Sequence, residues 1–457
     1  MKKYIFAGMA SLVMSMPLSA QITYPQTMEM HNPLFTQFGS PMFNNPDQYG
    51  NLYTADPSAH VWADGRLYVY ASHDMEPAQG CDRMDRYHVF STDDMLHWTD
   101  HGEILKADDL KSMGWDCAGF MWAPDCAYNP ADETYYYYFP HPTDLAHWGT
   151  TWRIGVATSK NPAEGFQTIG WIENVPPHID PCVFVDDDGQ PYLYVGGGGK
   201  CFGGKLRHDD WTKLDGEMQP MTGLVDFHEG TWVHKHNGTY YLSHPDNHGG
   251  DGNNMRYAMG NSPLGPWVDK GVILYPTGCE TSHGSIVDFK DKAYLFYHCC
   301  NVSGKGELRS VCADEITYNE DGTLNVVRNW GSPFAGTLPV LDTNGMTFEG
   351  EDFNVGPLNY GFYKHADYAK GNNTTYRDDE YQFVNTIDGR VCAQLTKSEW
   401  ARYSFKVNNP GRYSVVVTVK SASGTSQFHL SMNGDHIVPK SYVGTSWKPV
   451  EAVDVII

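Results

Sequence analysis

The stretch Thr54-Ala55-Asp56-Pro57-Ser58, with the turn Asp64-Gly65 and the aromatic run Leu67-Tyr68-Val69-Tyr70 behind it, sets a plan that recurs along the chain. The plan is a strand, a tight two-residue turn and a second strand rich in aromatic residues. It returns at Asp132-Glu133, Asp188-Gly189, Asn237-Gly238 and Asp291-Lys292, with spacings of 68, 56, 49 and 54 residues. Asp-Gly and Asn-Gly between β-rich runs are strong hairpin signals.

Another strand-like run follows each hairpin, and often a tryptophan turn, as at Trp98, Trp211 and Trp267. Five such units, each with room for about four strands, are typical of a five-bladed β-propeller. We therefore predict an all-β fold with the propeller as its first domain. A β-sandwich with many hairpins is the alternative, but it would not place polar residues at one shared position in the repeats.

Four repeats do carry an ionisable residue at a shared position, eight residues before the first residue of the turn: Asp56, Asp180, Glu229 and His283. The innermost strand of every propeller blade lines the axis, so the three acids are predicted to meet at one mouth of the channel. Glycoside hydrolysis needs one protonated carboxyl group to release the leaving oxygen and one ionised group to activate water or attack. A third carboxylate nearby would raise the pKa of the acid by like-charge repulsion.

The length of 457 residues suits two domains. The repeat register stops in the region 339–347, so we predict a propeller over residues 21–338 and a second domain over 339–457. In the second part, 400–407, 413–419 and 428–432 alternate like antiparallel strands. This pattern predicts a β-sandwich (jelly-roll) domain.

Residues 1–20 resemble a signal peptide, with Lys2-Lys3, an apolar stretch and the small-residue end Leu18-Ser19-Ala20. We therefore expect an exported protein, periplasmic or extracellular. No later segment has the roughly 18 consecutive apolar residues of a membrane span. The net charge of −23 disfavours nucleic acid and anionic lipid as partners, whereas a neutral polysaccharide would not be repelled.

Ten cysteines follow the predicted cleavage point. Four of them, Cys182, Cys299, Cys300 and Cys312, sit in strand-like apolar runs, where a free cysteine acts as a small core residue. Structural thiols are therefore the first expectation. An exported protein can also form disulfides, and one or two pairs stay open as an alternative.

Five segments of the chain resemble glycoside hydrolase family 43. They are Thr54-Ala55-Asp56-Pro57-Ser58, Phe120-Met121-Trp122-Ala123-Pro124-Asp125, His178-Ile179-Asp180-Pro181 with Asp186-Asp187-Asp188-Gly189, Phe227-His228-Glu229-Gly230-Thr231-Trp232, and Ser282-His283-Gly284-Ser285. The resemblance covers about residues 30–330. It implies an inverting hydrolase on a five-bladed propeller, with Asp56 as general base and Glu229 as general acid. Asp180 would tune the pKa of the acid and orient it.

The same resemblance implies roles for residues around the acids. His283 would sit near the channel centre, where family members often hold calcium or another ion through water. Arg309 would help to fix the acid cluster. The second blade carries Pro124 at the shared position and would supply no acid, while Trp122 and Phe120 would form a wall for the sugar.

The C-terminal part resembles a family 6 carbohydrate-binding module. The resemblance rests on Phe348-Glu349-Gly350-Glu351-Asp352-Phe353, Glu399-Trp400-Ala401-Arg402-Tyr403, Pro410-Gly411-Arg412-Tyr413 and Gly444-Thr445-Ser446-Trp447. It implies a structural Ca²⁺ near Glu349 and Glu351 and a sugar-stacking role for Trp447. Such modules usually continue beyond the last of these segments, so a module shortened at its C-terminal end is expected.

Together these features predict an exported hydrolase of plant cell-wall pentosans, namely arabinoxylan, xylan or arabinan. The expected activities are α-L-arabinofuranosidase and β-xylosidase, with no organic cofactor. The inserts 81–86 and 141–152 lie where loops would close a pocket, which favours exo action. An endo-arabinanase and a non-catalytic glycan-binding protein are the alternatives.

Overall fold

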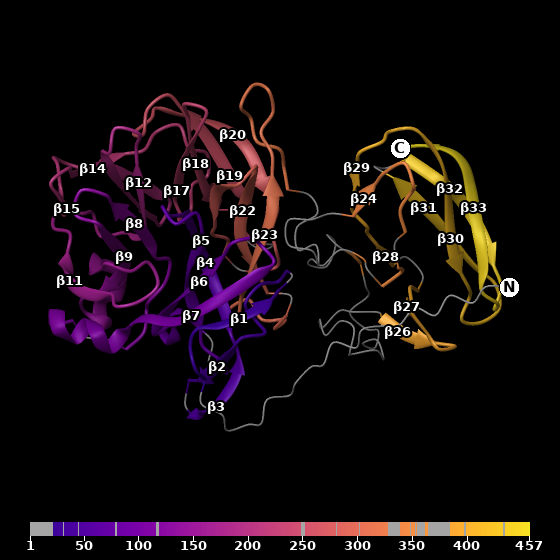
Figure 1. The fold of residues 1–457 in the computed structure, drawn as a ribbon, viewed down its shortest axis with the longest axis horizontal. Helices are drawn as coiled ribbons and strands as arrows, with labels where there is room; N and C mark the ends of the chain where they lie inside the picture. Colours follow the sequence, from indigo (N-terminus) through magenta and orange to yellow (C-terminus); the bar gives the residue numbers. More distant parts are fainter. Residues whose placement is uncertain are drawn as a thin grey trace. The chain divides into compact units, whose positions relative to one another are not determined.

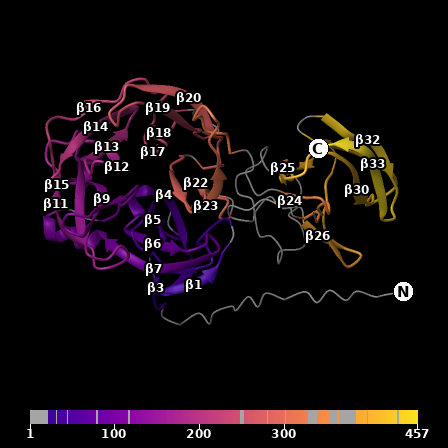
Figure 2. The same cartoon turned by 45° about the horizontal axis from the view of Figure 1, so that its top comes forward.

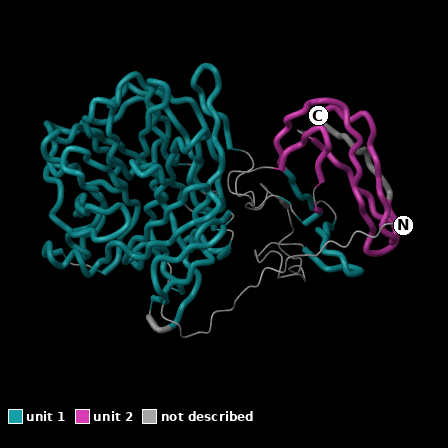
Figure 3. Tube along the Cα trace, in the orientation of Figure 1, with its two compact units in different colours: residues 1–337, 350–403 teal, residues 338–349, 404–457 magenta. Residues whose placement is uncertain are grey.

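The computed structural model describes residues 22–30, 32–43, 45–77, 80–115, 118–247, 252–279, 281–300, 302–327, 339–347, 349–351, 353, 362–363, 384–396, 399–432 and 435–457. The predicted signal peptide and Cys117 lie outside these residues. By its contacts the chain divides into two compact units, residues 1–337 with 350–403, and residues 338–349 with 404–457 (Figure 3). The domain limits predicted from the sequence stay a prediction.

The first unit holds five antiparallel sheets arranged as the blades of a propeller, which confirms the predicted fold (Figures 1 and 2). Blade one contains β4 (Tyr53–Val61), β5 (Leu67–Asp74), β6 (Arg86–Thr92) and β7 (His97–Lys106), with β1 (Gln26–Glu29) on its outer edge. Blade two contains β8 (Asp125–Asn129), β9 (Thr134–Pro142), β10 (Trp152–Ser159) and β11 (Gln167–Trp171). Blade three contains β12 (Ile179–Val185), β13 (Pro191–Gly197), β14 (Lys200–Arg207) and β15 (Asp210–Leu214), with β16 (Gln219–Pro220) beside β14.

The remaining two blades follow the same antiparallel order. Blade four contains β17 (Trp232–His236), β18 (Thr239–Pro245), β19 (Met255–Gly260) and β20 (Trp267–Leu274), and blade five contains β21 (Ser285–Phe289), β22 (Lys292–Cys299) and β23 (Ser310–Ile316). A hairpin of β2 (Gly39–Met42) and β3 (Asn45–Asn51) precedes blade one. Short 3₁₀ helices lie in the connections, η1 (Cys81–Arg83), η2 (Ala107–Met113) and η3 (Leu145–Thr150).

The hairpin turns form where the sequence predicts them, with one correction. Asn237 and Gly238 both have positive φ, 48° and 80°, which is the backbone that a two-residue turn between right-twisted strands requires. In blade five the linking residues are Lys290 and Asp291 rather than Asp291 and Lys292, because Lys292 already pairs with Phe289. Lys290 takes the positive φ of that turn, 57°.

Hydrogen bonds join the inner strands of neighbouring blades all the way around the ring. They run from Ser58 Oγ to Asp125, from the Val183 N–H to Asp125, from the Val233 N–H to Cys182 Sγ, from Trp232 Nε1 to the Ile286 carbonyl, and from the Ala59 N–H to Ser285 Oγ. Each blade is therefore fixed to the next close to the axis. Side chains that project from these inner strands consequently have a defined position at the channel.

The hydrophobic core lies between the blades rather than at the axis. One buried cluster, for example, packs Tyr70 and Tyr87 of blade one against Tyr137 and Phe139 of blade two. The segment before blade one closes the ring, because Asn32 donates to and accepts from the backbone of Ala313 on β23 at 2.9 Å. The last strand of blade five is thereby bonded to the N-terminal segment that precedes blade one.

The nine described cysteines are free thiols, and six of them are fully buried. Cys299 and Cys312 lie on neighbouring strands with their sulfurs 3.6 Å apart. Burial in strands agrees with the structural role predicted for Cys182, Cys299 and Cys312, whereas Cys300 is only half-buried and lies just after β22. Within the described part of the chain, no helix is long and apolar enough to cross a membrane.

The C-terminal part is also built of strands, consistent with the predicted sandwich. In the second unit, β30 (Arg412–Val419) pairs with β33 (Lys448–Ile456), β31 (Ser426–Met432) with β32 (Asp435–Val443), and β24 (Val340–Leu341) with β29 (Lys406–Val407). The segment 350–403 contains β25 (Phe362–Tyr363), β26 (Val384–Ile387), β27 (Arg390–Ala393) and β28 (Trp400–Ala401). The strand predicted over 400–407 is wrong as one element, because β28 and β29 pair with different partners, β25 and β24.

Candidate active site

Asp56 and Asp180 occupy matching irregularities in the inner strands β4 and β12. Both have positive φ, 52° and 53°, and in both strands the pairing register shifts around the Asp-Pro dipeptide. Asp tolerates this left-handed backbone better than most residues do. A β-bulge bends its strand and redirects one side chain. Both aspartates are almost fully buried, with exposures of 5% and 2%.

Arg309, just before β23, clamps Asp56 from blade five. Its Nη1 donates to Asp56 Oδ1 at 3.0 Å, while its Nε and Nη2 each donate to Asp74 at 2.9 Å. Burial acts to raise the pKa of Asp56, but the charge of Arg309, together with His298, His283 and a hydrogen bond from Ser72, lowers it to about 2. Asp56 is therefore an ionised carboxylate at neutral pH, the state that a general base requires.

His298 of β22 fixes the backbone of the same bulge. Its Nδ1 accepts the Asp56 N–H at 3.1 Å, and its Nε2 donates to the Thr281 carbonyl at 3.0 Å. Burial, followed by the charge of Arg309, lowers the pKa of His298 to about 3. The imidazole is thus neutral, with one tautomer set by its two partners.

Asp180 and Glu229 form the second half of the site. The Gly230 N–H donates to Asp180 Oδ2 at 2.9 Å, so the residue that follows Glu229 is tied to Asp180. Gly230 has a φ of 63°, and a Cβ there would lie 2.8 Å from Pro245, so glycine alone fits this link. Burial and then the nearby Glu229 and Asp56 raise the pKa of Asp180 well above its ordinary value.

Glu229 is less enclosed, with 21% of its side chain exposed. Its pKa is raised, first by burial and then by the negative charge of Asp56, against the opposing effect of His228. The site therefore contains an ionised carboxylate, Asp56, and a pair, Asp180 and Glu229, that holds a proton to higher pH. Carboxyl groups whose pKa values are pushed apart mark the acid and base assignments of a hydrolase.

His283, predicted beside the acids, lies there. Its Nδ1 is 3.9 Å from Asp56 Oδ1, and 13% of its side chain is exposed. Burial lowers its pKa, so it offers a neutral imidazole to the channel. A calcium ion prefers oxygen ligands, which fits His283 only as a partner to water on the ion. The ion site stays a prediction.

The aromatic residues of blade two form one cluster. Phe120 lies 5.5 Å from Trp122 between ring centroids, Trp152 lies 5.0 Å from Trp122, and Trp148 lies 5.6 Å from Phe120. Trp148, in the predicted rim insert, exposes 46% of its surface. Phe120 is buried and Trp122 half-buried, so Trp122 and Trp148 present more of this wall to solvent.

Two buried acids of the propeller centre escaped the sequence analysis. Asp74 is the second partner of Arg309, and Asp125 accepts hydrogen bonds from Ser58 Oγ and the Val183 N–H at 2.5 Å and lies 2.7 Å from His60 Nε2. Blade two was expected to supply no acid. This holds at the shared position, which is Pro124, but the next residue, Asp125, is an acid of the propeller centre. Asp125 lies one residue outside the shared position, so the repeat pattern gave no signal for it.

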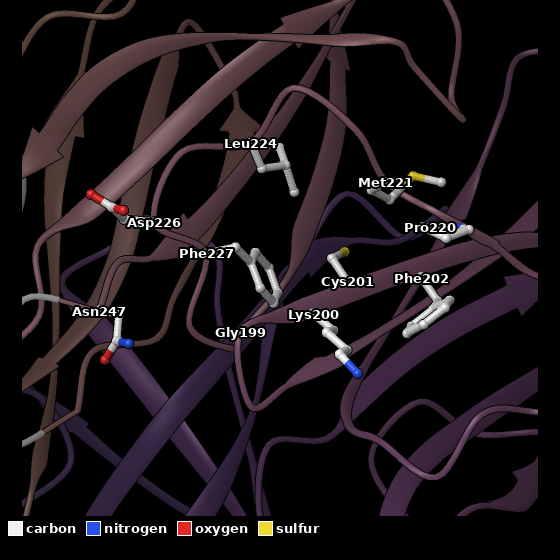
Figure 4. A pocket seen from close by; sticks show the side chains of 10 residues that line it. All are labelled: Gly199, Lys200, Cys201, Phe202, Pro220, Met221, Leu224, Asp226, Phe227 and Asn247. Atoms are coloured by element: carbon white, nitrogen blue, oxygen red, sulfur yellow. The ribbon is translucent and has the colours of Figure 1, made fainter.

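A cavity of about 670 Å³ opens beside the Glu229 segment (Figure 4). Its lining includes the rings of Phe202 and Phe227, together with Lys200 and Met221. It does not include the three acids. The Gly199 N–H donates to the His228 carbonyl at 3.1 Å, which fixes this rim against the residue before Glu229.

Glu349, Glu351 and Trp447 are the site residues predicted in the C-terminal part. Glu349 is exposed and Glu351 is buried. Trp447 is half-buried, and Lys420 Nζ lies 5.6 Å from its ring centroid. Their predicted roles in calcium binding and sugar stacking stay predictions.

Comparison with known proteins agrees with this geometry. Residues 49–324 match the family described as glycosyl hydrolases family 43. The chain belongs to this family. The resemblance noted in the sequence is thus confirmed for the propeller, and the enzyme is a glycosidase that hydrolyses O-glycosyl bonds.

Several proteins similar to this chain are named as xylosidases or arabinosidases. The chain is 37% identical over 329 residues to Xylosidase/arabinosidase 43A of Humicola insolens, covering 60% of this chain and 96% of that protein. It is 34% identical over 322 residues to a xylosidase/arabinosidase of Bacteroides ovatus, covering 60% and 94%. A family 43 β-xylosidase/α-arabinofuranosidase from a compost metagenome, solved with xylotriose, is 32% identical with a TM-score of 0.55, covering 66% of this chain and 98% of that one.

Proposed function

We propose that this family 43 enzyme is an exo-acting β-xylosidase and α-L-arabinofuranosidase of xylan or arabinoxylan that inverts the anomeric centre. The observation that carries the proposal is the opposed pKa shifts of Asp56, lowered to about 2, and Glu229, raised. The relatives named xylosidase/arabinosidase and the xylotriose complex support this choice of sugar.

In the proposed reaction, Glu229 donates its proton to the glycosidic oxygen as the bond to the sugar breaks. Asp56 takes a proton from a water molecule, which attacks the anomeric carbon from the opposite face. The fixed Arg309 keeps Asp56 ionised before the proton arrives. Asp180 holds the Glu229 segment through the Gly230 N–H, and its own pKa is raised by burial and by the nearby Glu229.

The surroundings of the acids support cleavage at a chain end or of a short substituent. The blade-two aromatic segment is tied to the Asp56 side of the site, because the Ala123 N–H donates to Ser72 Oγ at 2.8 Å and Ser72 hydrogen-bonds Asp56. The rim segment before Glu229 is fixed by the Gly199 N–H. Aromatic faces pack against the C–H faces of sugars.

The test uses the 4-nitrophenyl α-L-arabinofuranoside and β-xyloside with the wild type and Glu229→Gln. General acid catalysis contributes about 10²–10⁴-fold, so kcat of Glu229→Gln should fall by that order on xylotriose, whose leaving sugar is a poor leaving group, and by less on the aryl glycosides. Proton NMR of the first-formed sugar should show the inverted anomer. A retained anomer would reject inversion, and an active polymer substrate with inactive aryl glycosides would support the endo-arabinanase alternative.

Three further parts of the proposal concern the rest of the chain. We propose that residues 1–20 direct export, that the C-terminal strands form a family 6-like carbohydrate-binding module, and that Ca²⁺ binds through water near His283 or at Glu349 and Glu351. N-terminal sequencing of the secreted protein, and xylan retention of the wild type against Trp447→Ala, would test the first two. Calcium content after dialysis would test the third.

A further inference from the structure

Two buried histidines of blade one face each other with nitrogen atoms that lack hydrogen-bond partners. His73 stands near the end of β5 and His88 on β6, with exposures of 1% and 0%. Their rings are 4.8 Å apart between centroids and nearly perpendicular. His73 Nδ1 and His88 Nε2 are both buried without a partner. A buried polar atom without a partner costs free energy, so this pair requires an explanation.

The outer nitrogens determine the protonation of the inner ones. His88 Nδ1 lies 3.4 Å from Asp100 Oδ1, and a carboxylate only accepts, so the proton belongs on Nδ1. Ser40 Oγ donates to the Pro41 carbonyl at 3.3 Å, which leaves its lone pairs to accept from His73 Nε2 at 2.9 Å. This network assigns an unprotonated lone pair to both inner nitrogens.

A carboxylate completes the group. Glu103 of β7 pairs directly with His88 across the sheet, and one ligand atom from each of His73, His88 and Glu103 lies within 4.8 Å of the other two. Among the described residues this is the one group of three such side chains that converges. Two facing lone pairs and a carboxylate oxygen are all acceptors. A single water has two hydrogens and cannot donate to all three.

We propose that His73, His88 and Glu103 bind a divalent transition metal ion, Zn²⁺ in the first instance. Two imidazoles with one carboxylate suit zinc better than calcium or magnesium, which prefer oxygen ligands. The contacts of His88 with Asp100 and of His73 with Ser40 are the outer hydrogen bonds that metal-binding histidines usually make. A tetrahedral zinc with bonds of about 2.0–2.2 Å holds its ligand atoms roughly 3.3 Å apart. The ligand atoms must therefore approach one another by up to about 1.5 Å.

The charges around the group can accommodate that change. Glu103 now forms ion pairs with Arg86 and Lys106. Arg86 also bonds Asp85 through Nε at 2.7 Å and Nη2 at 3.1 Å, so it stays paired when Glu103 turns toward a metal. The Lys106 side chain is 50% exposed and can be hydrated instead. The three acids Asp85, Asp100 and Glu103 carry one more charge than the two cations Arg86 and Lys106, so the surroundings of the group are net negative.

This site is separate from the acids of the reaction, although β5 connects them. His73 directly precedes Asp74, which shares Arg309 with Asp56. A metal at His73 would therefore fix the end of β5 that supports the base. The proposal concerns metal binding and stability and does not rest on the proposed sugar specificity.

The experiment measures zinc on the tag-free chain. The protein is stripped with a chelator, equilibrated with a small excess of Zn²⁺, passed through a desalting column and analysed by mass spectrometry for metal. We expect one tightly held Zn²⁺ per wild-type chain and a Zn²⁺-dependent rise in thermal midpoint. Loss of outer hydrogen bonds alone weakens metal sites by about 10–100-fold, so His88→Gln and Glu103→Gln should each lower the apparent affinity at least tenfold. Loading with Co²⁺ should give a visible absorption band that both variants lack.

His147→Gln is the matched control, because His147 lies on the surface with 72% of its side chain exposed. It should bind zinc as the wild type does. If His88→Gln fails to fold, Glu103→Gln carries the test, since Glu103 sits at the more open side of the group. Zinc content equal in wild type and Glu103→Gln, or no zinc retained by the wild type, would overturn the proposal and leave a water between the histidines.

Discussion

Arg309 is the residue whose removal tests the electrostatics of the site most directly. Arg309→Met keeps an unbranched apolar stem and removes the guanidinium, whose Nη1 lies 3.0 Å from Asp56 Oδ1. Asp56 would remain buried, and burial acts to raise its pKa. We expect that pKa to move from about 2 to at least its ordinary value of 3.8. A shift of nearly two units corresponds to about 2.5 kcal/mol.

The assay is the pH dependence of kcat/KM, which reports the free enzyme. The wild type should keep its full kcat/KM at pH 4, because Asp56 is ionised well below that pH. The variant should have lost about 40% or more of it at pH 4 and recover as pH rises. The assignment would be refuted by a folded Arg309→Met protein whose kcat/KM falls at the same acidic pH as that of the wild type. Arg309 would then not be what keeps Asp56 ionised as the base.

A control is required because Arg309 also neutralises Asp74. Breaking a buried ion pair leaves an uncompensated charge and costs about 3–5 kcal/mol. The double variant Arg309→Met/Asp74→Asn removes that charge, and Asp74→Asn alone shows what the second change does. The lowered pKa of Asp56 contributes stability that is present above about pH 3.8 and is lost as pH falls through about 2. Urea unfolding at pH 6 and pH 3 should show that loss in the wild type.

Three further changes address other parts of the propeller. Asp125→Asn should lower the free energy of unfolding by about 1–3 kcal/mol, because buried bonds between three blades weaken; urea denaturation that matches the wild type would contradict this role. Trp122→Ala should raise KM about tenfold with kcat little changed, whereas Trp171→Ala, a change on the outer strand β11, should leave both unchanged. Asp180→Asn should lower kcat with KM little changed, because the Gly230 N–H loses the carboxylate that fixes the Glu229 segment; an unchanged kcat would contradict this positioning role.

Several features could be predicted from the sequence because they repeat. The hairpin turns and aromatic strands return about every 50 residues, and this period predicts blades without knowledge of their contacts. Because the inner strands of all blades face one axis, residues at the same position of each repeat, such as Asp56, Asp180 and Glu229, are expected at one mouth of the channel. Local chemistry was sufficient here, because Asp-Gly and Asn-Gly turns take their backbone from their own residues.

Other features depend on residues that are distant in sequence and follow no period. Asp74 meets Arg309 across 235 residues, and Asp125 bonds Ser58 and Val183 on two other blades. The turn of blade five was misplaced by one residue, because strand pairing rather than turn preference set it. The facing lone pairs of His73 and His88 also arise only when β5 and β6 pair.

The sequence by itself therefore determined the blades and which acids share a position, since both follow from a repeated local pattern. Tertiary structure decided which of those acids is ionised. That difference depends on burial and on the distance to Arg309, and both come into existence only when the fifth blade closes against the first.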